Sequence, residues 1–178
     1  MRLLITTLFA FFAVQFFGQE RINIAFKVEG EDGLSYYNDE PITGIVYLDF
    51  FNGYRSYEAF FLNGKQNGLT RAWHSNGLSQ IEYNLSNGKK DGIQREWYDN
   101  GQLLIFENYK DGKREGKFTE WYKNGKLKFE AFYINDLKDG NRRRWYENGQ
   151  LMFESIYSND KLISQKCWDE NGQIIECP

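Results

Sequence analysis

Short runs of alternating apolar and polar residues, separated by glycine-containing turns, fill most of the chain. Between residues 92 and 115, two β-prone runs flank the pair Asn100-Gly101, and a second turn begins at Lys110. An Asn-Gly pair between two such runs is a strong local signal for a β-hairpin. The pattern predicts an all-β fold built from short antiparallel strands.

The hairpin unit recurs with a period of 24 residues. Trp73 is followed by Trp97, Trp121 and Trp145 at this spacing, and the last unit is one residue short. Such self-similarity is typical of a stacked repeat in which each unit contacts only its neighbours. We therefore predict tandem β-hairpin repeats over residues 41–178, about five full units and a truncated C-terminal hairpin, that form an elongated, twisted antiparallel meander sheet. The glycines expected in the hairpin turns are Gly53, Gly77, Gly101, Gly125, Gly149 and Gly172.

A three-residue loop at 99–101 sets the predicted register of the hairpins. With Gly101 in the left-handed conformation, Trp97 pairs with Leu103 across the strands. One face is then apolar in successive units, and we interpret it as the repeat core. Its residues are Trp73, Trp97, Trp121, Trp145, Leu103, Leu127, Leu151, Ile105, Phe129, Phe153, Tyr109, Tyr133 and Tyr157.

The opposite face is mixed in character, as expected for a face in contact with water. It carries Tyr98, Tyr122 and Tyr146, whose amphipathic rings are of a kind enriched at protein interfaces. These three are the candidate partner-binding residues, and their alternative role is packing within the sheet. His74 occupies the same repeat position and is interpreted as the replacement of one aromatic ring by another.

The same register predicts ion pairs between neighbouring strands. It places Glu120 opposite Lys128 and Arg142 opposite Glu154, with Arg143 on the other face. Opposite charges in such positions contribute about 0.2–1 kcal/mol each. The glutamates that recur with the repeat are therefore interpreted as partners of cations, and the alternatives are a Ca²⁺ site or an acid/base pair.

The first 18 residues have the pattern of a secretory signal peptide. Arg2 precedes an apolar run that ends at Phe17, and cleavage is expected after Gly18. The alternative is an uncleaved membrane anchor, but such a run spans only about 22 Å as a helix, short of the ~30 Å hydrocarbon core. We therefore expect an exported protein, periplasmic, envelope-associated or secreted, without a transmembrane segment after cleavage.

Residues 19–40 do not match the repeat. Apolar residues alternate with polar ones from Ile22 to Val28, which predicts an extra strand that caps the exposed first edge of the sheet. Near the other end lie the only two cysteines, Cys167 and Cys177. Export makes a disulfide between them feasible, and the sequence leaves their pairing open.

The composition excludes several classes of function. Lys and Arg number 22 against 25 Asp and Glu, so the chain lacks the basic surplus that a nucleic-acid binder uses to displace counterions. The only histidine, His74, has no further ligands at metal-binding spacing. We expect no cofactor and no enzymatic activity, but a module that binds a protein or a cell-surface component. The oligomeric state stays open.

The repeat resembles a known family. Trp145-Tyr-Glu-Asn-Gly-Gln-Leu151, followed by Phe153-Glu154 and Tyr157, is similar to the bacterial variant of the MORN repeat and to the YwqK family of putative antitoxins. The resemblance implies an interaction scaffold, or alternatively an antitoxin that neutralises a toxin by direct binding, and it supplies no catalytic residues. The chain departs from the pattern in its export signal and at Asp49-Phe50, where Trp-Tyr is expected.

Overall fold

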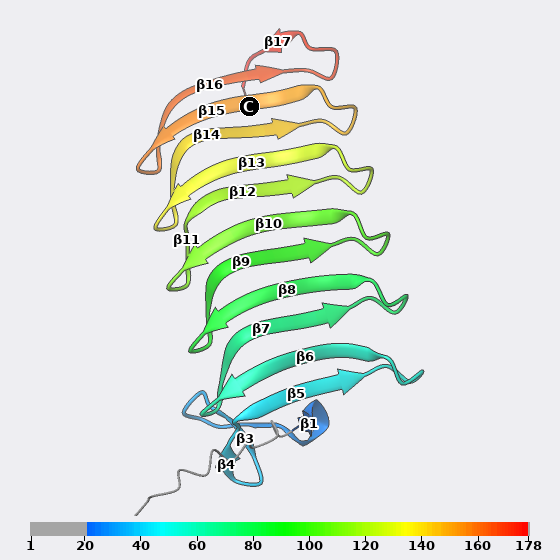
Figure 1. Ribbon diagram of the computed structural model, residues 1–178. Helices are drawn as coiled ribbons and strands as arrows, with labels where there is room; N and C mark the ends of the chain where they lie inside the picture. Colours follow the sequence, from blue (N-terminus) through cyan, green and yellow to red (C-terminus); the bar gives the residue numbers. More distant parts are fainter. Residues whose placement is uncertain (1–20, 178) are drawn as a thin grey trace, which may run out of the picture.

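The computed structural model describes residues 21–177, most of whose strands form one long sheet of stacked hairpins (Figure 1). Successive strands of this sheet are antiparallel neighbours in chain order, and within residues 21–177 only β1 runs parallel to its neighbour, β5. The all-β repeat fold is thus confirmed, while the expected signal peptide lies outside the described residues. The elements are β1 (Arg21–Asn23), η1 (Ile24–Phe26), β2 (Val28–Glu29), β3 (Ser35–Tyr37), β4 (Glu40–Pro41), β5 (Gly44–Asp49), β6 (Arg55–Leu62), β7 (Lys65–Trp73), β8 (Ser79–Ser86), β9 (Lys89–Trp97), β10 (Leu103–Lys110), β11 (Lys113–Arg114), β12 (Gly116–Trp121), β13 (Leu127–Ile134), β14 (Leu137–Trp145), β15 (Leu151–Ser158), β16 (Lys161–Trp168) and β17 (Ile174–Ile175).

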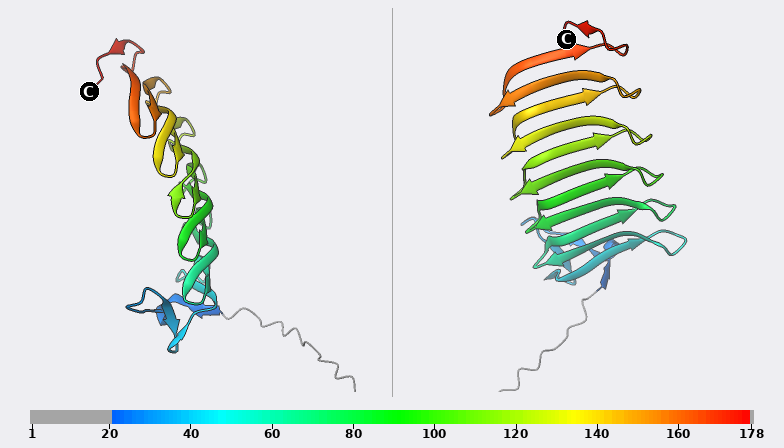
Figure 2. Two further views of the ribbon diagram at one scale, coloured as in Figure 1. Left: turned by 90° about the vertical axis from the view of Figure 1, so that its left-hand side faces the viewer. Right: turned by 45° about the horizontal axis from the view of Figure 1, so that its top comes forward.

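The sheet is a single twisted layer, and in the described part of the chain the segment at its N-terminal end is the one part that packs beside it (Figure 2). β1 adds to the edge of β5, and β2, β3 and β4 form a small separate sheet. The largest group of buried apolar side chains lies at this end and comprises Ile22, Ile42, Val46, Ala59 and Phe61. The N-terminal edge of the repeat stack is therefore covered.

The predicted capping strand is interrupted. Ile22 is buried beside β5, but the side chain of Asn23 accepts a hydrogen bond from the backbone N–H of Ala25 at 2.9 Å, and the chain turns into η1. Phe26 and Val28, expected on the same strand face, are exposed instead. An asparagine that bonds its own backbone two residues on competes with strand pairing, which explains the break.

The hairpin loops have the predicted geometry. Trp97 pairs with Leu103, and the N–H of Gly101 donates to the carbonyl of Tyr98 at 2.9 Å. Gly101 has a φ of +83°, the left-handed conformation that glycine adopts at least cost. The three-residue loop is thus confirmed.

Beyond the loop, the predicted register is wrong by one residue. Ile105 pairs with Glu96, so Leu104 is an extra residue in β10, a β-bulge. Because side chains alternate along a strand, one extra residue moves every later side chain to the other face. Ile105 and Tyr109 therefore lie on one face of the sheet and Trp97 and Leu103 on the other, whereas all four were expected on the same face. The same bulge recurs at Ser56, Gln80, Lys128 and Met152.

The two faces can now be defined. The tyrosine face carries Tyr83, Tyr109, Tyr133 and Tyr157. It also carries Gln94, which pairs with Tyr83 on one side and with Glu107 on the other. The tryptophan face carries Trp73, Trp97, Trp121 and Trp145. It also carries a row of charged residues that pair as Glu82 with Arg95 and Arg143 with Glu154.

Tight two-residue turns link one hairpin to the next. At Asp111-Gly112 both residues have positive φ, +51° and +83°, which defines a type I′ turn matched to the twist of the strands. The last two turns contain no glycine, yet Asn135-Asp136 and Asn159-Asp160 adopt the same conformation. Asn and Asp tolerate the left-handed region, as expected from the sequence.

Candidate functional site

The candidate partner-binding tyrosines hold neighbouring units together. The phenol of Tyr98 donates to the carbonyl of Trp121 at 3.0 Å, that of Tyr122 to Trp145 at 2.7 Å, and that of Tyr146 to Trp168 at 3.1 Å. The three side chains are half-buried. Their polar ends are thus satisfied within the sheet, which favours the packing role over the binding role.

His74 makes the equivalent contact, with Nε2 2.9 Å from the carbonyl of Trp97. A bond to a carbonyl requires the proton on Nε2, so the ring acts as a donor in place of a phenol. The interpretation of His74 as an aromatic replacement is confirmed.

The loop asparagines form a second contact between units. Asn100 accepts a hydrogen bond from the N–H of Gln102 at 3.1 Å, which closes its own loop, and its amide donates to the carbonyl of Lys123 at 3.1 Å in the next loop. Asn76 and Asn148 repeat both contacts. The recurring asparagine therefore positions both its own turn and the following unit.

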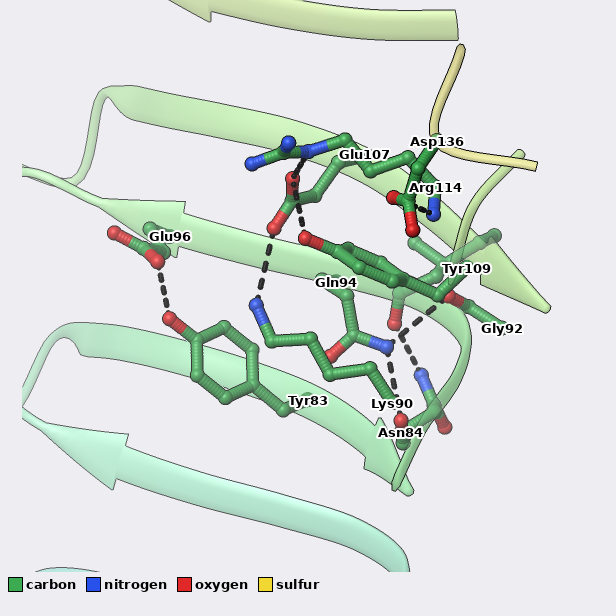
Figure 3. A network of polar contacts seen from close by, with 11 residues as sticks. Tyr83, Asn84, Lys90, Gly92, Gln94, Glu96, Glu107, Tyr109, Arg114 and Asp136 are labelled. Atoms are coloured by element: carbon green, nitrogen blue, oxygen red, sulfur yellow. Dashed lines mark hydrogen bonds and ion pairs between the residues drawn. The ribbon is translucent and has the colours of Figure 1, made fainter. Parts of the chain in front are cut away.

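A buried carboxylate lies at the centre of the tyrosine face (Figure 3). Glu107 exposes 7% of its side chain and contacts Lys90 at 3.1 Å, Arg114 at 3.4 Å and the hydroxyl of Tyr109 at 3.2 Å. Lys90 also lies over the rings of Tyr83 and Tyr109, at 4.6 and 4.8 Å from their centroids. Two cations therefore compensate the buried charge and join three neighbouring strands.

The tyrosines of this network titrate at high pH. Burial raises the pKa of Tyr83, and the hydrogen bond to the carboxylate of Glu96 raises it further. Burial and the charge of Glu107 likewise raise the pKa of Tyr109. Both phenols are therefore neutral hydrogen-bond donors at physiological pH, and the network has the character of a structural cluster.

The charged row on the tryptophan face alternates in sign from β6 to β9 and again from β13 to β16, and Phe106 and Thr119 interrupt it on β10 and β12. Glu82 lies 3.6 Å from both Arg71 and Arg95, and Arg143 lies 3.1 Å from Glu130 and 2.6 Å from Glu154. The recurring glutamates are thus ion-paired.

Two details of the predicted ion pairs change with the register. Glu154 pairs with Arg143 and not with Arg142, because the bulge at Met152 shifts β15 by one residue. Arg142 lies on the tyrosine face, 4.6 Å from the ring centroid of Phe153. Glu120 and Lys128 do form an ion pair, at 2.6 Å, although Glu120 is paired with Phe129.

An exposed apolar patch lies at the turn edge of β13–β15. Ile134 and Leu137 pair across the turn on the tryptophan face, and Phe132 precedes Ile134 by two positions. Ile156 is the repeat equivalent of Phe132 in the next unit and lies opposite Asn141 of the intervening strand. Phe132, Ile134, Leu137 and Ile156 each expose 41–45% of their surface. We call these four residues the C-terminal patch.

The two preceding units carry polar residues at these positions. Their turn edges hold Asn84, Ser86 and Lys89, then Asn108, Lys110 and Lys113. The first unit has Phe60 and Leu62 there, next to the covered N-terminal end. Large apolar side chains at the C-terminal patch are therefore not required by the repeat itself, because the same fold forms without them two units earlier.

A groove of about 390 Å³ lies beside Phe132, above Gly140. Its charged wall is formed by Glu130, which contacts Lys117 at 2.9 Å and Arg143 at 3.1 Å. Burial acts to raise the pKa of Glu130, but the hydrogen bonds from Lys117 and Arg143 outweigh it and lower that pKa. An apolar surface rimmed by fixed charges is the usual composition of a protein interface.

A disulfide links Cys167 of β16 to Cys177, with their Cα atoms 5.3 Å apart. Ile175 pairs with Cys167 in the same place. The disulfide thus holds Cys177 beside the C-terminal end of β16, next to the last hairpin loop.

Residues 21–177 contain no group of three or more His, Cys, Asp or Glu side chains that could hold a metal ion. Nor does this part of the chain contain a helix with the length and apolar character needed to cross a membrane.

The fold and its contacts define a tandem β-hairpin repeat protein. The family model described as the MORN repeat variant matches residues 90–111, 114–135 and 138–159, three consecutive units. Repeats of this kind are generally modules that contact proteins or membranes. No curated protein matches the chain.

Sequence reasoning missed the C-terminal patch. Its members sit at positions that are polar in the units around Asn84 and Asn108, so a comparison of the units position by position could have found it. The amphipathic rings of the tyrosines point to those residues instead, but their hydroxyls make contacts between units.

Proposed function

We propose that the protein is an exported, non-enzymatic interaction module that binds one protein partner through the C-terminal patch. The observation that carries this proposal is the replacement of Asn, Lys and Ser by Phe132, Ile134, Leu137 and Ile156 in units that otherwise share one framework. Burying such side chains against a partner contributes about 1.5–3 kcal/mol for each large one. The groove beside Phe132 and the ion-paired Glu130 give the surface both a recess and a polar rim.

Export is supported by two features of the chain. Residues 1–18 carry the signal-peptide pattern, and Cys167 and Cys177 are paired. Disulfides persist in oxidising compartments and are rare in the cytosol, so both features favour a location outside it.

The repeat supplies its own substitutions for a test. Phe132→Asn and Ile156→Asn install the residue found at the equivalent positions 84 and 108, and Ile134→Lys and Leu137→Lys install those of 110 and 113. The fourfold variant should therefore fold. Leu78→Gln is the matched control, because it replaces an exposed apolar residue at the other edge by its equivalent from later units.

The experiment captures partners from the native envelope fraction with the tagged mature chain, residues 19–178. The captured protein is then purified and titrated against each variant. We expect the fourfold variant to bind at least tenfold more weakly, a loss of about 1.4 kcal/mol, while Leu78→Gln binds as the parent does. Equal binding by the parent and the fourfold variant would contradict the proposal. A partner that stops growth unless this chain is co-expressed would make the binding an immunity function.

A further inference from the structure

The last strand of the sheet has an open edge. β15 pairs with β16 from Cys167 to Lys161, whereas β17 pairs with β16 only at Cys167 and Trp168. In the unit before, β15 accompanies β14 from Gly140 to Trp145. Within residues 21–177, the stretch 161–166 therefore has no strand on its outer side. An open edge of this kind presents free backbone donors and acceptors to another strand.

The disulfide explains why the last strand is short. Ile175 takes the place opposite Cys167 that Phe153 takes opposite Arg144 in the unit before. The next residues would continue along β16, but Cys177 is bonded back to Cys167. Within residues 21–177, the chain thus forms only the first two pairs of a strand along the outer side of β16.

The two ends of the repeat stack differ. Ile22 and Ile42 are buried at the N-terminal end, where β1 covers β5. At the C-terminal end, Leu162, Ile163 and Ile174 expose 46%, 59% and 78% of their surface. Terminal units of a stacked repeat normally present a polar outer surface. An apolar open edge is instead typical of a site that accepts a further strand.

The charged row indicates what that strand carries. On the tryptophan face the row runs from Arg143 to Glu154, and Glu154 is paired in register with Lys166. Lys166 is exposed and makes no ion pair among the described residues. Continued alternation requires an acidic residue opposite it on the incoming strand.

A second copy of the chain fits this edge poorly. Antiparallel pairing of β16 with β16, centred on Ile163 and Ser164, would set Lys161 against a lysine at both ends. Like charges directly opposite each other are destabilising.

We propose that the open edge of β16, residues 161–166, accepts an antiparallel strand from an extended peptide with an acidic residue opposite Lys166 and apolar residues after it. Backbone hydrogen bonds supply the affinity of such pairing, and the acidic residue sets the register. This site is distinct from the C-terminal patch and does not depend on it.

The probe is a seven-residue peptide with the sequence of residues 154–160, Glu-Ser-Ile-Tyr-Ser-Asn-Asp, added at millimolar concentration to the ¹⁵N-labelled mature chain. It begins at the glutamate because Ile175 already occupies the place opposite Cys167. Its glutamate is the residue that faces Arg143 one unit earlier. We expect amide shifts confined to residues 161–166 and their neighbours. A peptide with lysine in place of that glutamate should bind about fivefold more weakly, and Lys166→Glu should reverse the preference.

Alternate N-methylation tests the mode of binding. Alternate N–H groups of the bound peptide face β16, and the others face away from it. Methylating the nitrogens that face β16 should abolish the amide shifts, while methylating the others should leave the shifts unchanged. Equal binding of the two charge variants by the parent chain would overturn the proposal, as would shifts centred on the tyrosine face. Shifts at residues 161–166 that depend on protein concentration without peptide would also overturn it, because the edge would then be occupied by a second copy.

Discussion

The hydroxyl of Tyr122 lies 2.7 Å from the carbonyl oxygen of Trp145, 23 residues further along the chain. Because this hydrogen bond joins two neighbouring units, each hairpin positions the next one. The loop asparagines make equivalent hydrogen bonds to the following unit. The stack is therefore stabilised by interactions between units, as expected of a quasi-linear repeat protein.

Removing one of these phenols should loosen the stack. We expect Tyr122→Phe to lower the free energy of unfolding by about 1 kcal/mol, because it deletes one hydrogen bond and leaves a carbonyl without its donor. Tyr54→Phe is the control, since Tyr54 is an exposed tyrosine in the loop of the first unit. Urea unfolding followed by tryptophan fluorescence measures both. Equal midpoints for Tyr122→Phe and the parent chain would show that the bond contributes nothing.

The loop glycines should resist substitution for a conformational reason. Gly125 has a φ of +84°, and a Cβ there would lie 3.0 Å from Oε1 of Gln102 in the preceding unit. Gly125→Ala should therefore cost about 1–2 kcal/mol of stability, because alanine is strained in the left-handed region. Gly125→Asn should cost clearly less, since asparagine tolerates this φ. Similar urea midpoints for the two variants would rule out the left-handed backbone as the cause.

The local features of the fold could be predicted from the sequence. Asn100-Gly101 specifies its loop because few residues adopt the required left-handed conformation, and the fixed period shows that the units stack. The bulge could not be predicted in this way. The extra residue is Leu104 in one unit, Lys128 in the next and Met152 in the third, so no residue type marks it. In each of these strands, the extra residue places every later side chain on the face opposite to the predicted one.

The candidate site was harder to predict than the fold. The aromatic rings of Tyr98 and its equivalents were expected to contact a partner, but a hydrogen bond to a carbonyl 23 residues away has no signature in a linear sequence. The C-terminal patch depends on which apolar side chains remain exposed. Exposure follows from the face and the edge on which Phe132 lies, and the face was assigned only once the bulge was known.

Stability should fall in acid through Glu130. Its folded pKa is lowered despite burial, by hydrogen bonds from Lys117 and Arg143, so the ionised form stabilises the fold above its unfolded pKa of about 4.3. That contribution is lost as the pH falls through the folded pKa.

The variant Glu130→Gln should thus be less stable than the parent at pH 7, by about 1 kcal/mol, and equally stable near pH 2. Urea unfolding at a series of pH values measures the difference. The control Glu170→Gln, at an exposed position in the last loop, should have the same stability as the parent chain throughout the series. A gap between Glu130→Gln and the parent that is independent of pH would mean that the carboxylate charge plays no part.

Reduction of the disulfide should act only at one end of the sheet. Cys167 and Cys177 are separated by 10 residues, and closing a loop of this size stabilises the folded form by about 3 kcal/mol in the chain-entropy model. Because each unit contacts only its neighbours, the loss should appear in β17 and at the loop end of β16. Hydrogen exchange with mass spectrometry should show faster exchange there after reduction, with β9 and β10 unchanged. The double variant Cys167→Ser/Cys177→Ser should exchange in the same pattern without reductant and should not respond to it. Faster exchange through all units would instead mean that the disulfide stabilises the whole stack, and that the hairpins unfold as one cooperative body.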